Sequence, residues 1–148
     1  MPEQDLIGGL IETYRVLNNT VRTIPESQLR SAPAETPAVR DIMRRFRDDE
    51  LRFSQALKER ITGVPMPDIF SSDELPTLGT ETDHDTTAML IAQFGTARES
   101  TLAMLRDLSE TEWDAPVDDG TSIRTRVIEL LDNDKRQLSR ISTLLPAR

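Results

Sequence analysis

Hydrophobic residues recur every three or four positions along four stretches of the chain, which is the period of one face of an α-helix. The stretches cover residues 5–22, 37–62, 86–108 and 123–145. Strict alternation of polar and apolar residues, which marks a half-buried strand, is scarce. The pattern therefore predicts an all-α protein with four long helices.

Capping residues set the expected ends of these helices. Thr36 is a good N-cap for the second helix, and Pro37 suits its first position, where a missing N–H costs nothing. Gly63 is expected to be its C-cap. The sequence at 82–85 resembles a capping box for the third helix, and Ser122 precedes the fourth. Pro146 is expected to close the fourth helix.

The connection between the second and third helices is long, from about Gly63 to Thr82, and contains three prolines. A short loop places neighbouring helices antiparallel, whereas a long one allows a crossover to a parallel neighbour. We therefore expect an up-down-down-up four-helix bundle with a long crossover loop between helices 2 and 3. The length of 148 residues suits one domain, spanning residues 1–148.

Two short blocks of similar sequence, 25–29 and 109–113, each precede a long helix. A duplicated helix pair would explain the similarity. Chance would also explain it, because capping and turn chemistry favour the same residues in both places.

The acidic composition limits the partners. The formal net charge is −8 and the pI is about 4.7, which argues against nucleic acid and against anionic membranes as partners. No apolar run approaches the length of a transmembrane helix, and the first residues lack a signal-peptide pattern. We expect a soluble, cytoplasmic protein.

One histidine, His84, and no cysteine are present in the whole chain. A catalytic zinc or iron site takes about three protein ligands, mostly imidazole or thiolate, so this chain cannot supply one. Cysteine nucleophiles and disulfides are excluded for the same reason. We therefore expect no metal and no cofactor.

Three stretches, taken in order, carry a family resemblance: 34–42 at the start of the second helix, 94–116, and 121–145. Their order and spacing are similar to those of the DinB-like (YfiT-like) four-helix bundle superfamily. The resemblance implies this fold and dimers. It also implies metal-dependent hydrolase or thiol-transferase chemistry on small molecules, with one histidine on the second helix and a His-x-x-x-His pair on the last.

The resemblance places Arg45 at the first of these ligand positions, and Asn133 and Gln137 at the other two. A one-residue change of register would place Arg44 there instead. An arginine cannot lose its proton and would repel a divalent metal ion. Asn133 and Gln137 are four residues apart and share a helix face, but they offer only neutral amides. The metal site is therefore interpreted as degenerate.

Charged residues also interrupt the apolar stripes. Either Asp49 or Glu50 falls in the stripe of the second helix, and Asp134 falls in that of the fourth. A buried carboxylate needs a partner, and Arg45 is the expected one. Together with Asn133, Gln137 and Asp134, Arg45 is predicted to bind a small anionic ligand. A purely structural ion-pair network is the alternative, whereas Arg45 disfavours a hard cation held by the three acids.

Other polar and aromatic residues receive structural interpretations. The arginines at 40, 44, 47 and 52 alternate with acids and are interpreted as a solvated helix face. Trp113 is expected to cap the end of the core. Tyr14 lies on the buried face of the first helix, where its hydroxyl reaches either the polar network or solvent.

The leading functional hypothesis is a non-catalytic protein that binds a small anionic ligand, with a homodimer as its assembly. The first alternative is a transferase or hydrolase on small molecules, either metal-independent or with an atypical metal, and with Asp49 or Glu50 as the catalytic base. The second is a dimeric structural or interaction module. Whether the chain is an enzyme is left open, because fold similarity alone does not decide function.

Overall fold

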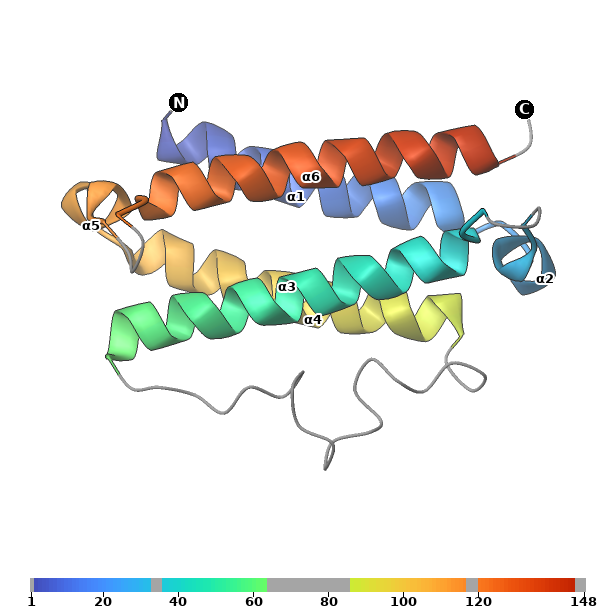
Figure 1. Cartoon of the computed structure of the whole chain (residues 1–148), viewed down its shortest axis with the longest axis horizontal. Coiled ribbons are helices and arrows are strands. Elements are labelled where there is room, and N and C mark those ends of the chain that lie inside the picture. The colour runs from blue at the N-terminus through green and yellow to red at the C-terminus, as the bar shows by residue number, and fades with distance from the viewer. Residues whose placement is uncertain (1, 33–35, 64–85, 117–119, 146–148) are drawn as a thin grey trace. The chain divides into compact units, whose positions relative to one another are not determined.

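A computed structural model describes residues 2–32, 36–63, 86–116 and 120–145. These ranges contain helices and no strand, apart from one isolated bridge between Pro116 and Ser122. The helices are shown in Figure 1: α1 (Glu3–Val21), α2 (Glu26–Arg30), α3 (Val39–Thr62), α4 (Thr87–Asp107), α5 (Glu110–Asp114) and α6 (Ile123–Leu144). The expected all-α class is confirmed for this part of the chain.

The four predicted helices correspond to α1, α3, α4 and α6; the C-cap at Gly63 and the start of the fourth helix after Ser122 are as expected. Gly63 ends α3 with a left-handed φ of 71°, a conformation that costs glycine little. The Ser122 hydroxyl accepts a hydrogen bond from the Thr125 backbone N–H at 3.1 Å and caps the start of α6.

The start of α3 differs from the prediction. Ala38, rather than Thr36, is the N-cap residue, and Pro37 precedes the helix instead of opening it. The physical reason is that the Asp41 carboxylate accepts a hydrogen bond from the Ala38 N–H at 3.0 Å, which fixes the first turn there.

At the start of α4, the Thr86 hydroxyl accepts a hydrogen bond from the Met89 N–H at 3.1 Å. This is the cap that the structure describes for the helix. The capping box expected at 82–85 and the closing Pro146 lie outside the described residues.

The two similar blocks fold into five-residue helices, α2 and α5, which the helical period alone did not predict. In α5, the Ser109 hydroxyl accepts from the Glu112 N–H, while the Glu112 carboxylate accepts from the Ser109 N–H. Each short helix buries one large apolar residue, Leu29 in α2 and Trp113 in α5. Trp113 is 1% exposed and therefore part of the core, whereas its expected role as the cap of the core's end stays a prediction.

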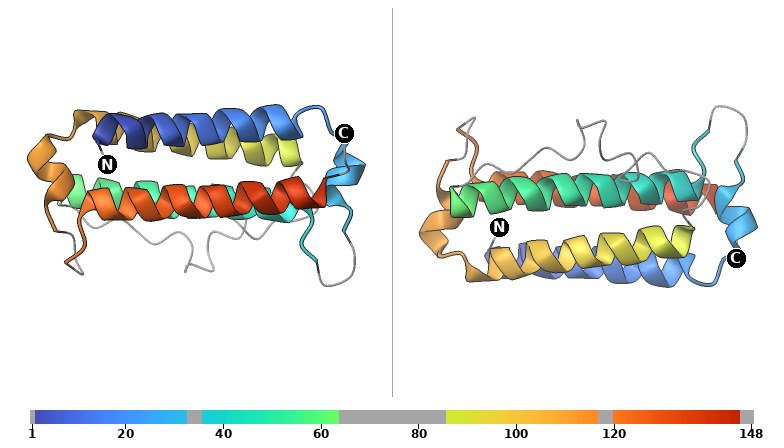
Figure 2. Two further views of the ribbon diagram at one scale, coloured as in Figure 1. Left: turned by 90° about the horizontal axis from the view of Figure 1, so that it is seen from above. Right: turned by 90° about the horizontal axis from the view of Figure 1, so that it is seen from below.

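The helices form two compact units. Unit 1 consists of the residues up to Ile24 and from Leu102 onward, with α1, α5, α6 and the last turns of α4. Unit 2 consists of Pro25–Thr101, with α2, α3 and most of α4. In unit 1, α6 lies against α1 and α5, and in unit 2, α2 lies at the start of α3 (Figures 1 and 2).

Both units contain buried apolar residues, and burial of this surface is the main stabilising contribution. In unit 1 the core includes Leu6, Leu10, Leu17, Val21, Trp113, Val127, Leu131 and Ile141. In unit 2 it includes Leu29, Val39, Ile42, Met43, Phe46, Leu57, Leu90 and Phe94. Among the helices that the structure describes, none is long and apolar enough to cross a membrane.

Candidate functional site

A fully buried ion pair joins α3 and α4 in unit 2. The Arg98 Nε donates to one oxygen of the Glu50 carboxylate at 2.9 Å, and Nη2 donates to the other at 2.8 Å. Both residues are only 1% exposed. This two-bond geometry satisfies both carboxylate oxygens, and burial of such charges is tolerable only with this kind of pairing.

Further polar pairs continue along the same two helices. One turn before Glu50, the Arg47 Nη1 donates to the Gln93 Oε1 at 2.8 Å, and one turn after it the hydroxyls of Ser54 and Ser100 lie 3.4 Å apart. The three pairs advance in the same direction along α3 and α4. We call the side chains of the three pairs, from Arg47 to Ser100, the polar ladder of unit 2.

Aromatic rings pack against the ladder. The Arg98 guanidinium carbon lies 4.9 Å from the centre of the Phe94 ring, and the Phe46 and Phe94 ring centres are 5.3 Å apart. A cation over an aromatic face gains about 2 kcal/mol when the contact is desolvated. The Arg98 guanidinium is therefore embedded in an apolar core.

Arg47 is as deeply buried as Arg98, at 1% exposure. Its carboxylate partner is the adjacent Asp48, with Nε and Nη2 each 2.9 Å from Oδ1. The Asp48 side chain is 18% exposed, so water reaches this pair on one side. In the described part of unit 2, two guanidinium groups and one glutamate are thus buried.

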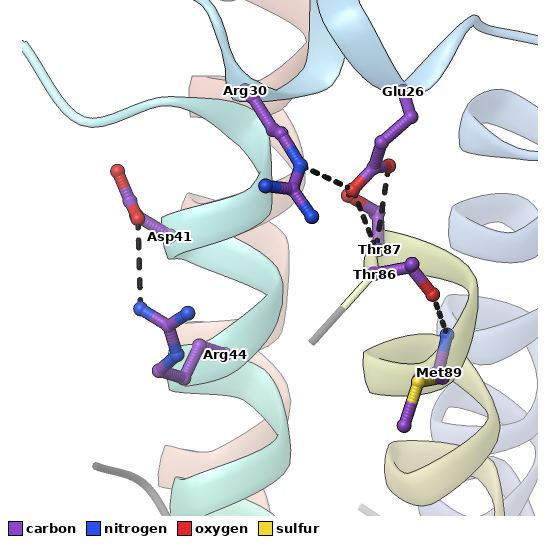
Figure 3. A network of polar contacts seen from close by, with 7 residues as sticks. All are labelled: Glu26, Arg30, Asp41, Arg44, Thr86, Thr87 and Met89. Carbon is purple, nitrogen blue, oxygen red and sulfur yellow. Dashed lines mark hydrogen bonds and ion pairs between the residues drawn. The ribbon is translucent and has the colours of Figure 1, made fainter. Parts of the chain in front are cut away.

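A second polar cluster lies where α2 meets the start of α4 (Figure 3). The Glu26 carboxylate accepts hydrogen bonds from the Thr87 N–H at 2.9 Å, the Thr87 hydroxyl at 3.1 Å and the Arg30 Nε at 3.0 Å. Partial burial raises the pKa of Glu26, but the hydrogen bonds from Thr87 and Arg30 outweigh it and lower the pKa below its ordinary value.

The same view shows Arg44 on α3 (Figure 3), and in the sequence Arg44 comes three residues before Arg47. Its Nη1 lies 3.7 Å from the Asp41 carboxylate, and its side chain is 14% exposed. Arg44 and Arg47 therefore bring two largely buried cations to the N-terminal half of α3.

The structure separates the two acids that the sequence left undecided. Glu50 faces the core, whereas Asp49 is half-buried and pairs with Arg45 at 3.8 Å. The Arg45 side chain is 61% exposed, so its pair with Asp49 lies at the surface. The expectation that Arg45 neutralises the inward carboxylate is wrong, because Arg98 from α4 occupies both oxygens of Glu50.

The other predicted site residues lie on α6, in unit 1. Asp134 and Gln137 are buried, and Asn133 is half-buried. The Gln137 Oε1 accepts a hydrogen bond from the Arg140 Nη1 at 3.0 Å. Because Arg45 belongs to unit 2, a single site formed by Arg45 and these α6 residues stays a prediction.

The structure differs from the sequence-based expectation at two arginines of the ladder. The pattern along the chain places Arg47 on a solvated face and gives Arg98 no role, whereas both are 1% exposed. Arg98 lies four residues after Phe94, on the same buried face of α4. A charged residue at a position where the helical period expects an apolar one is the sequence feature that indicates its burial. Arg47 borders the buried face of α3, where its long side chain reaches inward to α4.

Arg124, at the start of α6, contacts the start of α1 and the end of α5. Its Nη2 lies 2.8 Å from the Glu3 carboxylate and its Nε 2.8 Å from Asp114, while the guanidinium carbon lies 5.6 Å from the centre of the Trp113 ring. Hydrogen bonding to Arg124 lowers the pKa of Asp114. This half-buried cluster ties α1 and α5 to α6.

Within the described ranges, no group of three or more His, Cys, Asp and Glu side chains is arranged to hold a metal ion. His84 lies outside those ranges. Comparison with known proteins adds no assignment: no family model, no curated protein and no solved structure matches the chain.

Proposed function

We propose that this chain is a metal-independent, non-catalytic protein that binds a small anionic ligand through the buried arginines of unit 2. The observation that carries the proposal is the excess of buried cations among the described residues of this unit, where Arg47 and Arg98 are buried against one buried carboxylate, that of Glu50. A guanidinium in an apolar setting binds carboxylate or phosphate groups strongly, because water competes less for its donors.

Arg47, with Arg44 beside it, is the proposed contact for the ligand. Arg98 is already engaged by both oxygens of Glu50, whereas the carboxylate beside Arg47 belongs to a partly exposed neighbour, Asp48. A ligand carboxylate or phosphate can replace Asp48 at this position without leaving a buried charge alone. The same bonds to Arg98 make Glu50 a poor general base, which supports the non-catalytic interpretation.

We also propose the DinB-like, up-down-down-up topology. The common direction of the three α3–α4 pairs supports parallel α3 and α4. In unit 1, Arg124 meets Glu3 and Leu131 lies beside Gly9, which supports parallel α1 and α6. The homodimer and the cytoplasmic location rest on the resemblance and the acidic composition alone.

The test is thermal unfolding of the purified full chain with phosphate, acetate, succinate or citrate, against chloride at equal ionic strength. A ligand at 100 times its Kd stabilises the folded state by about 2.7 kcal/mol, so a dose-dependent rise in Tm is expected for at least one anion. The double variant R44Q/R47Q should lose the rise, whereas R45Q, which changes an exposed arginine, should keep it.

No rise with any of these anions would contradict the proposal. Metal content and melting curves with zinc, nickel and manganese provide the second readout. A stoichiometric metal ion, or a rise in Tm with one of these metals, would instead support the metal-dependent enzyme.

A further inference from the structure

The helices of the chain form two sets with the same spacing. Each element of the set α4, α5, α6 begins 84 residues after its counterpart in the set α1, α2, α3. The two short helices also have the same length of five residues. No insertion or deletion separates the starts of the three elements, although the two sets share little sequence.

Burial follows the same spacing. Leu6 and Leu90, Leu29 and Trp113, and Met43 and Val127 are pairs at this spacing, and all six side chains are buried. The spacing also applies to charge: Glu50 and Asp134 are counterparts, and each is 1% exposed. An acid at 1% exposure is rare, so its presence at both counterpart positions is more specific than apolar burial.

Contacts between helices repeat as well. In unit 2, Arg47 of α3 reaches Gln93 of α4. Their counterparts in unit 1 are Leu131 of α6 and Gly9 of α1, and these are also neighbours: a Cβ built on Gly9 would lie 2.9 Å from a Leu131 methyl group. The same pair of positions thus forms the helix contact in each unit, once with polar and once with apolar residues.

We infer that the chain is a fusion of two copies of one repeat, and that the two copies have exchanged their first helices. Each repeat consists of a long helix, a short helix and a second long helix. Unit 1 combines α1 of the first copy with α5 and α6 of the second, and unit 2 combines α2 and α3 of the first copy with most of α4. Exchange of an identical element between copies is a common route to dimers, and a connecting segment makes it permanent. This inference is independent of the proposed ligand.

The copies differ at the polar ladder. Tyr14 is the counterpart of Arg98, as Asp134 is of Glu50, so the structurally equivalent positions hold Arg–Glu in unit 2 and Tyr–Asp in unit 1. If the units are copies, each backbone must accept the other's pair. This requirement provides the test.

The experiment grafts each pair into the other unit of the full chain and measures thermal unfolding by circular dichroism. R98Y leaves Glu50 without its cation and should lower Tm strongly. The graft R98Y/E50D should melt at least about 5 °C above R98Y, and Y14R/D134E should likewise exceed Y14R. The matched control L10R/D134E, with arginine one turn earlier on α1, should melt no higher than L10R.

If a single variant does not fold, recovery of the helical signal in its double variant is the readout. A double variant that is no more stable than its single variant, in either unit, would overturn the inference. Equal rescue by the control L10R/D134E would also overturn it, because rescue would then not depend on counterpart positions.

Discussion

At the scale of single residues, the buried pair Glu50–Arg98 has the largest energetic consequence. Removing one partner of a buried ion pair leaves an uncompensated charge, whereas replacing both by apolar residues is often nearly neutral. The exposed pair Arg45–Asp49 gives the contrasting case, because solvent screens it and its side chains remain free to move.

We therefore expect R98M to lower the free energy of unfolding by about 3–5 kcal/mol, and the double variant R98M/E50M to recover most of this loss. Urea denaturation of R98M, E50M and R98M/E50M gives the free energy of unfolding of each and completes a double-mutant cycle. R45A is the control and should change stability by less than about 1 kcal/mol. A loss in R98M no larger than that in R45A would contradict the burial of the pair.

Glycines provide a second prediction at this scale, with opposite signs at two positions. Gly63 has φ of 71°, where alanine is strained, so G63A should destabilise by about 1 kcal/mol. Gly8 is in α1 and has no atom within 4 Å of an added Cβ, so G8A should stabilise by about 0.5–1 kcal/mol. The midpoints of urea denaturation, compared at an unchanged dependence of the free energy on urea, measure both stability changes. Changes of the same sign in G63A and G8A would contradict the described backbone.

At the scale of the elements, the contact between α2 and the start of α4 is set by one carboxylate. Glu26 takes hydrogen bonds from both the N–H and the hydroxyl of Thr87, so it satisfies a donor that a helix start otherwise leaves without an intrahelical partner. A side chain distant in sequence thus takes on part of the capping of α4, while Thr86 supplies the local cap.

This contact predicts a pH dependence. Because the folded-state pKa of Glu26 is lowered, the ionised carboxylate stabilises the fold above the ordinary pKa of glutamate, and this contribution is lost as the pH falls through the lowered value. E26Q should therefore be less stable than the parent at pH 7, and the difference should shrink on acidification. Melting curves from pH 7 to pH 3 measure it, with E12Q, an exposed change on α1, as control.

A constant difference between E26Q and the parent over that range would contradict the role of the ionised carboxylate. It would show that the hydrogen bonds from Thr87 depend on the shape of the side chain and not on its charge.

At the scale of the whole molecule, the direction of α3 and α4 decides how the chain is connected. Residues 63–86 join the two helices. The 24 residues of α3 rise 1.5 Å each, so the helix is about 36 Å long. If α3 and α4 are parallel, the connection must span this length to return to the start of α4. If they were antiparallel, a few residues would be enough.

Shortening the connection tests the proposed topology. With residues 64–85 replaced by two glycines, the connection spans at most about 14 Å, so α4 can pair in parallel only with α3 of a second chain. At dilutions where the parent is a monomer, we expect the mass from light scattering to double relative to the parent. A 22-residue Gly/Ser replacement is the control and should leave the mass unchanged. An unchanged mass in the shortened chain would indicate antiparallel helices.

The sequence predicted the elements well because their signals are local. The period of apolar residues identified α1, α3, α4 and α6, and the caps at Gly63 and Ser122 follow from the conformations and hydrogen bonds of adjacent residues. The lack of cysteine and the single histidine argue against a cysteine nucleophile and a histidine metal site, and this expectation needs only the composition. The short helices α2 and α5 were not predicted, because five residues are too few to show the helical period of apolar positions.

What only the tertiary structure decided is the partner of each buried charge. Asp49 and Glu50 differ by about 100° around the helix, and the packing of α3 determines which one is buried. The partner of Glu50 is 48 residues away on α4, whereas Arg45, the neighbour that the sequence suggested, lies at the surface. Local sequence encodes helices and their ends, but the pairing of buried charges depends on which helices pack together.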